Sequence, residues 1–149
     1  MKILFDHQVF SSFSYGGILR YFCSLLNSFA SDSEITFDVA IRYSNGEYLS
    51  SASWAQNISS YLKRLPYKGF LKLPSIAING LLVKPTNSYL RFKNKQLACK
   101  KLDQRNFDVF HPTYYAPYFL RHIGNKPFVL TIHDLIHERF PQYYISQKQ

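Results

Sequence analysis

The stretch that decides the fold is Ile3-Leu-Phe-Asp6, followed after a short loop by Tyr15-Gly-Gly-Ile-Leu-Arg-Tyr-Phe22. The first run is short, apolar and closed by an acid, which is typical of a buried strand in a parallel sheet. After Gly17, apolar residues recur at helical spacing, at Ile18, Phe22, Leu25 and Phe29 with Leu19 and Leu26 beside them. The opening of the chain therefore predicts a strand, a glycine loop and a helix.

The remaining pattern predicts further alternation of strands and helices. Signals between Asn45 and Leu82 are weak, because prolines and glycines divide that region into short pieces. The predicted elements are a strand over Thr36–Tyr43, a helix over Thr86–Gln104 with Pro85 in its first turn, a strand over Phe107–His111, a brief helix within Tyr114–Leu120, the clearest strand over Pro127–Ile132, and a short helix from Asp134 ended by Pro141.

Strands that alternate with helices predict an α/β fold with a mostly parallel, Rossmann-like sheet flanked by helices. Ligands of such sheets bind beyond the carboxyl ends of the strands. Three groups fall there: the loop from Asp6 to Gly17, the segment from His111 to Tyr115, and the pair His133-Asp134. We expect these three groups to converge.

Length and composition limit the function classes. The chain of 149 residues has the size of one domain, and 46% hydrophobic residues suffice for a core. A net charge of +9 predicts an anionic partner. Cys23 and Cys99 lie in no metal-like spacing, so we expect reduced thiols. No run approaches the ~20 apolar residues of a bilayer span, and Asp6 interrupts any signal peptide, so we expect a cytoplasmic protein.

Gly16 and Gly17 lie between a predicted strand and helix, where a bare backbone and free helix N–H groups suit an anion. The pattern is neither a dinucleotide fingerprint nor a Walker loop. A simple connecting turn is the alternative. His133 can hydrogen-bond a sugar or phosphate, and Asp134 can bind a hydroxyl or merely cap the next helix. His133 and His137 have zinc-protease spacing, but Asp134 stands where that family needs Glu, so we expect no metal.

Eleven of the eighteen Lys and Arg residues lie between Lys63 and Arg105, with one acid. This segment suits an anionic membrane surface at the inner face of the membrane, or it is a solvated helix face. No nucleic-acid motif accompanies the charge, so we expect no nucleic-acid partner. The residues that would contact a membrane are Lys63, Arg64, Lys93, Lys95, Lys100 and Lys101.

The segment after His111 ends in Tyr114 and Tyr115. Aromatic faces beside polar groups suit sugars, which stack their C–H faces on rings. Two tyrosines that cover a sheet edge are the alternative.

The order of four motifs resembles the N-terminal domain of glycosyltransferase family 4. These motifs are Ile3-Leu-Phe-Asp6, Tyr15-Gly-Gly-Ile-Leu-Arg-Tyr-Phe22, Phe107-Asp-Val-Phe-His-Pro-Thr-Tyr-Tyr115 and Val129-Leu-Thr-Ile-His-Asp-Leu135. The resemblance is strong at both ends of the chain and weak from about Asn45 to Leu102.

The resemblance implies the N-terminal half of a GT-B enzyme, which transfers a hexose with retention from a nucleotide-sugar and needs no metal or other cofactor. Gly16 and Gly17 would approach the donor's phosphates, and His133 would bind the transferred sugar as the catalytic residue. The acceptor side would be lined by Asp134, His111, Tyr114 and Tyr115.

The family's basic pair and second acidic motif belong to a C-terminal domain that these 149 residues do not include. Residues 1–149 are therefore expected to form an incomplete N-terminal domain that is inactive alone and needs a C-terminal partner. The expected acceptor is a glycan or lipid-linked glycan in surface polysaccharide synthesis. The alternative is a non-catalytic Rossmann-like module that binds acceptor, membrane or a partner chain.

Overall fold

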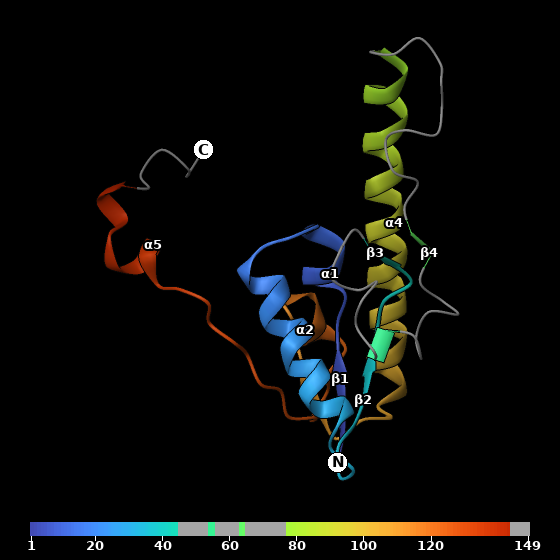
Figure 1. The fold of residues 1–149 in the computed structure, drawn as a ribbon, viewed down its shortest axis with the longest axis vertical. Helices are drawn as coiled ribbons and strands as arrows, with labels where there is room; N and C mark the ends of the chain where they lie inside the picture. The colour runs from blue at the N-terminus through green and yellow to red at the C-terminus, as the bar shows by residue number, and fades with distance from the viewer. Residues whose placement is uncertain (45–53, 56–62, 65–76, 144–149) are drawn as a thin grey trace.

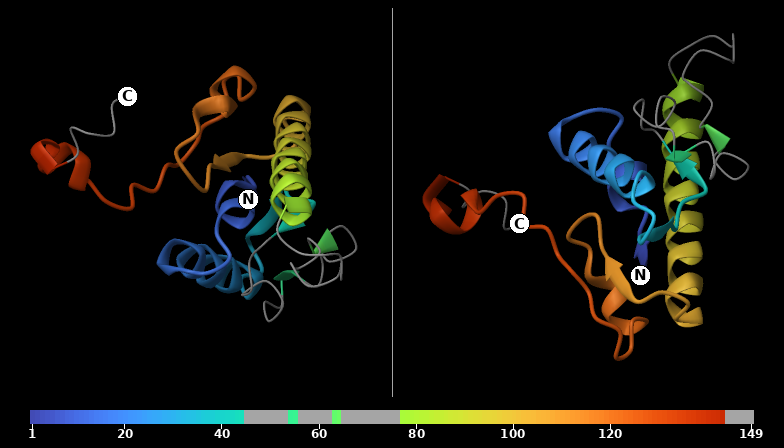
Figure 2. Two further views of the ribbon diagram at one scale, coloured as in Figure 1. Left: turned by 90° about the horizontal axis from the view of Figure 1, so that it is seen from above. Right: turned by 60° about the horizontal axis from the view of Figure 1, so that its bottom comes forward.

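The computed structural model describes residues 1–44, 54–55, 63–64 and 77–143, with the backbone alone for 63–64, 77–87 and 137. Its centre is a parallel sheet in the order β2-β1-β5, formed by β1 (Lys2–Phe5), β2 (Thr36–Val39) and β5 (Val109–His111); β1 and β2 are labelled in Figure 1, and the arrow of β5 is visible in Figure 2. In this register Ile3 lies opposite Phe37 on one side and Val109 on the other. The predicted α/β class with a parallel sheet is confirmed for the described residues.

Helices α2 (Gly17–Ala30) and α4 (Ala77–Gln104) cover opposite faces of this sheet (Figure 2). Strand side chains alternate between faces. Ile3 and Phe5 therefore join one core cluster with the apolar side of α2, whereas Leu4 joins the other with Ala98 and Leu102 of α4. The short helix α1 (Gln8–Ser12) follows β1 directly, within the predicted loop.

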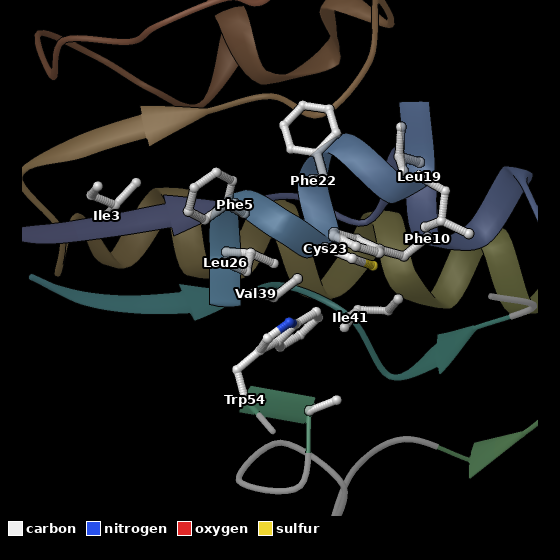
Figure 3. Packing of buried hydrophobic residues seen from close by; sticks show 12 residues of the cluster. Ile3, Phe5, Phe10, Leu19, Phe22, Cys23, Leu26, Val39, Ile41 and Trp54 are labelled. Carbon is white, nitrogen blue, oxygen red and sulfur yellow. The ribbon is translucent and has the colours of Figure 1, made fainter. Parts of the chain in front are cut away.

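Aromatic rings fill the cluster beneath α2 (Figure 3). The Phe5 ring lies 6.5 Å from that of Phe22 and 6.4 Å from that of Phe37, both edge to face. Trp54 also packs in this cluster, and its ring centroid lies 5.8 Å from that of Phe10. Full burial of one such side chain stabilises the fold by about 1.5–3 kcal/mol, so this cluster fixes α2 on the sheet.

Several predicted elements are confirmed with altered bounds. The strand at Ile3–Phe5, the helix after the glycine loop and the strand ending at His111 are present. The brief helix predicted near Tyr114 is the 3-10 helix η2 (Pro117–Arg121), and the short helix before Pro141 is α5 (Ile136–Arg139), followed by η3 (Pro141–Tyr143). Most of the weakly patterned region from Asn45 to Leu82 lies outside the described residues.

Two predicted boundaries are wrong. The strand predicted over Thr36–Tyr43 ends at Val39, because the N–H of Ile41 bonds back to the Val39 carbonyl at 2.8 Å and turns the chain. Residues Tyr43–Ser44 form a separate strand, β3, which pairs with β4 (Lys63–Arg64). The long helix begins at Ala77, so Pro85 lies inside it and not in its first turn.

The strand predicted over Pro127–Ile132 is also wrong: only one bridge forms, between Phe128 and Phe110. Phe110 bonds through both its N–H and its carbonyl to this segment, at 3.0 and 2.9 Å. Pro112 lies two residues after Phe110, just past the end of β5, and it has no N–H to continue the ladder. Beyond this bridge the chain leaves the sheet and runs toward α5 (Figure 1).

Large apolar residues remain exposed along this departing segment. They are Val129, Leu130, Ile132, Leu135, Ile136 and Phe140. Within the described parts of the chain, no helix combines the length and apolarity that crossing a bilayer requires.

Candidate functional site

The glycine loop leaves its backbone open at the start of α2. Gly16 has φ +122° and ψ 169°, a conformation that side-chain-bearing residues rarely adopt. A Cβ added at Gly16 or Gly17 would meet no heavy atom within 4 Å, and among the described residues no side chain caps this end of α2. The first N–H groups of the helix can therefore meet an anion directly.

The His133 ring is surrounded by four aromatic rings. Their centroids lie 6.0 Å (Tyr21), 5.8 Å (Phe22), 6.4 Å (Tyr114) and 5.9 Å (Tyr115) from that of His133. The His133 backbone N–H donates to the Tyr115 hydroxyl at 2.7 Å. Its Nε2 is buried and has no hydrogen-bond partner among the described residues. A buried nitrogen in this condition has unused capacity to bind a polar ligand atom.

Two contacts connect His133 and the tyrosine pair to the glycine loop. Tyr21 lies one helical turn after Gly17 and touches the His133 ring. Phe13, in the loop before Gly16, lies 5.5 Å from the ring of Tyr114. The expected convergence of these groups is thus found on the side of the sheet covered by α2.

His111 is buried between the rings of Phe5, at 5.2 Å, and Phe22, at 5.4 Å. Its Nε2 lies 2.9 Å from the Thr131 hydroxyl, which ties the end of β5 to the segment that carries His133. Burial lowers the pKa of His111, Asp6 opposes this effect, and the nearby His133 adds to it. His111 therefore holds the site together, and acceptor contact by its ring stays a prediction.

Asp134 is exposed and its Oδ1 accepts the Ile136 N–H at 3.3 Å, at the start of α5. This contact forms a turn just before α5, whose N-cap is Leu135, and acceptor binding by Asp134 stays a prediction. The paired rings of Tyr114 and Tyr115 lie 4.7 Å apart, and Tyr115 is exposed. The tyrosine pair therefore presents one accessible ring beside His133.

Asp6 is the centre of a buried hydrogen-bond network that sequence reasoning missed. Its Oδ1 accepts the N–H of Thr113 at 2.9 Å and the Thr113 hydroxyl at 2.6 Å. Its Oδ2 accepts the Gln8 amide at 2.6 Å and the Tyr118 hydroxyl at 2.9 Å. The signal in the sequence is an acid directly after an apolar strand, a pattern that by itself predicts only the end of the strand.

This network positions two parts of the candidate site, the glycine loop and the segment that carries Tyr114 and Tyr115. Gln8 begins α1, which precedes the glycine loop, and its side chain also bonds the backbone of Tyr114 and Ala116. Burial and then the Asp6 carboxylate raise the pKa of Tyr118, so its hydroxyl stays protonated and donates. Asp6 is therefore a positioning residue for the loop and for the tyrosine segment.

His7, next to Asp6, is a second buried histidine. Its Nδ1 lies 3.1 Å from the Ser11 hydroxyl, and its Nε2 has no partner among the described residues. Burial lowers the pKa of His7, against the opposing charge of Asp6. The His7 ring is therefore neutral at pH 7, and its centroid lies 6.0 Å from that of the Tyr118 ring.

The basic residues divide between packing and exposure. Lys101 pairs with Asp38, so its charge is compensated. Lys95 lies over the Tyr118 ring and Lys93 over the Tyr89 ring, while Lys100 is exposed. The side chains of Lys63 and Arg64 lie outside the described residues.

Metal-binding groups were sought among His, Cys, Asp and Glu. In the part of the chain that the structure describes, no three of these side chains are grouped to hold an ion. The side chain of His137 is outside that part. Cys23 and Cys99 are free thiols whose pKa values are raised by burial, that of Cys23 to about 11.

Comparison with known proteins adds no relative from which a role could be transferred. No protein-family model, curated protein or solved structure matches this chain.

Proposed function

We propose that the chain is the N-terminal portion of a retaining GT-B glycosyltransferase with a Rossmann-like fold. It would transfer a sugar from a nucleotide-sugar to a glycan or lipid-linked acceptor in surface polysaccharide synthesis, at the cytoplasmic face of a membrane. The observation that carries the proposal is the contact between the His133 ring and Tyr21, one turn from the open backbone of Gly17. The imidazole of His133 and the N–H groups at the start of α2 would then bind the sugar and the phosphates of the same ligand.

Each part of the donor has a chemical counterpart in this arrangement. The phosphates would meet the N–H groups at the start of α2, where the helix dipole favours negative charge. A sugar hydroxyl would bond the unpartnered Nε2 of His133 once the aromatic rings around it open. The acceptor would lie along Tyr114, Tyr115 and His111, with Asp134 at the rim.

The test measures sugar transfer in a lysate of the protein's own cells, so that any C-terminal partner is present. Radiolabelled UDP-glucose, UDP-galactose and GDP-mannose are supplied in turn, and label in lipid-linked and polymeric glycan is counted. We compare wild type with His133→Ala and with the control His122→Ala, whose side chain pairs with Asp103.

We expect transfer by wild type and His122→Ala, and a loss of about 100-fold in His133→Ala, the scale found when one donor to a transition state is removed. Equal transfer by His133→Ala and wild type would refute the assignment of His133. If wild type transfers sugar from none of the three donors, the result would count against the proposed glycosyltransferase activity.

A non-catalytic glycan-binding module is the second candidate. Two observations favour it. The Asp134 carboxylate already accepts the Ile136 N–H, and the Nε2 of His133 is buried and so shielded from a substrate. In that case the purified chain should bind immobilised glycans by itself. Tyr115→Ala should abolish this binding, and His133→Ala should leave it unchanged.

A further inference from the structure

A second group of polar side chains lies just past the end of β1, where α1 meets α4 (Figure 1). At its centre is His7, which is 7% exposed and whose Nε2 has no hydrogen-bond partner among the described residues. The other ring nitrogen, Nδ1, lies 3.1 Å from the Ser11 hydroxyl. Buried polar atoms without a partner are rare in folded proteins, so this Nε2 indicates a place for a polar ligand.

Helix α4 brings two cations to the His7 ring. Arg91 and Lys95 are four residues apart, so they share one face of the helix, and both are exposed. Burial is the largest cause that lowers the pKa of His7, and the Asp6 carboxylate opposes it. The charges of Lys95 and Arg91 lower this pKa further, which places both cations near the ring. The Lys95 ammonium also lies 5.4 Å from the centre of the Tyr118 ring, on which His7 packs.

Asn94 holds this face of α4 in place against α1. It is 1% exposed, and its side-chain amide donates to the Ser11 hydroxyl and to the Tyr43 carbonyl, both at 2.7 Å. Its Oδ1 accepts the N–H of Tyr43 at 3.0 Å. Because Ser11 is also the partner of the His7 ring, these bonds fix the helix that carries both cations relative to His7. The cluster is therefore built before any ligand arrives.

We propose that a phosphoryl group binds at this point, held by the Nε2 of His7 and by the cations of Arg91 and Lys95. The two cations match the two charges of a phosphoryl dianion, and charge-assisted hydrogen bonds from arginine and lysine are strong ones. The site is distinct from the one around His133, because α4 and α2 cover opposite faces of the sheet. This phosphoryl site therefore stands independently of the proposed glycosyltransferase activity.

Asp6 is the acid beside this cluster. Its carboxylate accepts hydrogen bonds from Gln8, Thr113 and Tyr118, so its charge is stabilised within the protein. A phosphoryl group in the site would face two cations and this one acid, so the net interaction is attractive.

Other ligands fit these groups less well. Both cations would repel a metal ion, and in the described part of the chain no three His, Cys, Asp or Glu side chains are grouped to hold one. A carboxylate carries a single charge and would leave one cation uncompensated. Because Nε2 is buried, a ligand reaches it only when neighbouring side chains move, and the side chains of Arg91 and Lys95 are long and exposed.

Binding of inorganic phosphate to the full-length protein is measured by calorimetry at constant ionic strength. R91Q and K95Q each remove one charge from the site, whereas K100Q removes one from another face of α4. We expect K100Q to bind like wild type, and R91Q and K95Q to bind about tenfold more weakly, the loss of one charge-assisted hydrogen bond. Equal affinity in all four proteins, or equally tight binding of acetate and phosphate by wild type, would overturn the proposal.

Glycerol 3-phosphate distinguishes the two sources of such a group, because it carries a phosphoryl dianion on an organic molecule. Tighter binding than that of inorganic phosphate would assign the site to a phosphate ester. Weaker binding would assign it to free phosphate.

The contribution of His7 is tested by titrating its ring in nuclear magnetic resonance. Sulfate replaces phosphate here, because it remains a dianion while histidine titrates. Protonated His7 would donate to the anion from Nε2, so sulfate should raise the pKa of His7 by about one unit, which corresponds to about tenfold tighter binding to the protonated form. The resonance is assigned by its absence in H7Q, and His122, which pairs with Asp103, is the internal control.

No rise in the pKa of His7, or an equal response of the His122 resonance, would overturn the proposal. R91Q and K95Q lie at exposed positions, so they test the site even if H7Q does not fold.

Discussion

Replacing Asp6 by alanine should lower the stability of the fold more than the same replacement of any exposed acid. The carboxylate is fully buried and accepts bonds from Thr113, Gln8 and Tyr118. In the alanine variant the Gln8 side-chain amide can still donate to the carbonyls of Tyr114 and Ala116. Four donors lose their acceptor: the N–H groups of Gln8 and Thr113 and the hydroxyls of Thr113 and Tyr118.

The magnitude follows from these four donors. A buried donor left unsatisfied costs about 1–3 kcal/mol, so Asp6→Ala should lower the free energy of unfolding by about 4–12 kcal/mol. Domains of this size are stable by about 5–15 kcal/mol, so part of the variant could be unfolded in buffer. Asp6→Asn retains a carbonyl oxygen for Thr113 and should lose less.

The assay is urea unfolding followed by circular dichroism. With a slope of about 2 kcal/mol per molar urea, a loss of 4 kcal/mol lowers the midpoint by about 2 M. Asp103→Ala is the control, because Asp103 is exposed and its pair with His122 should contribute at most about 1 kcal/mol. An Asp6→Ala midpoint within the range of the Asp103→Ala midpoint would refute the reasoning.

Three further predictions concern the same region. Gly16→Ala should destabilise the protein by about 1–3 kcal/mol because of its positive φ; Gly17→Ala, with open space and helical backbone, should stay within about 0.5 kcal/mol, and equal urea midpoints for the two would contradict this. The pKa values of His111 and His7 are lowered from 6.5, so their neutral rings contribute stability that is complete above pH 6.5 and is lost as pH falls through the folded pKa values. The urea midpoint should thus fall from pH 7 toward pH 5, less steeply in His111→Gln; an unchanged slope would assign the effect elsewhere. Cys23, buried and with a pKa of about 11, should react with a disulfide reagent at pH 8 far more slowly than the half-buried Cys99, and comparable rates in the folded protein would show that α2 opens readily.

The sequence predicted those elements whose pattern is local. The apolar run at Ile3–Phe5 and the helical spacing after Gly17 each report one strand or helix and its buried side. Pro85 predicts a helix boundary because proline is unfavourable inside helices, yet α4 continues through it. The run at Pro127–Ile132 has the composition of a strand, but its pairing depends on Pro112, just past the end of β5, and no local pattern reports that.

The candidate site was predicted in outline and not in its contacts. Three loops were expected at one edge because parallel strands end together, and His133 does meet Tyr21 and Tyr114 there. The role of Asp6 depends on Thr113, 107 residues away along the chain, and burial decides that role. Sequence pattern also could not distinguish the compensated Lys101 from the exposed Lys100 on the same helix.

The strand order β2-β1-β5 has a consequence for synthesis on the ribosome. One edge of β1 can pair as soon as Val39 has emerged, but the other edge waits for His111, about seventy residues later. At 5–20 residues per second, this delay is roughly 4–14 s. During it the Asp6 carboxylate stays hydrated and the apolar edge of β1 is open to other nascent chains. The growing polypeptide is therefore most exposed to chaperones, and most dependent on them, in that interval.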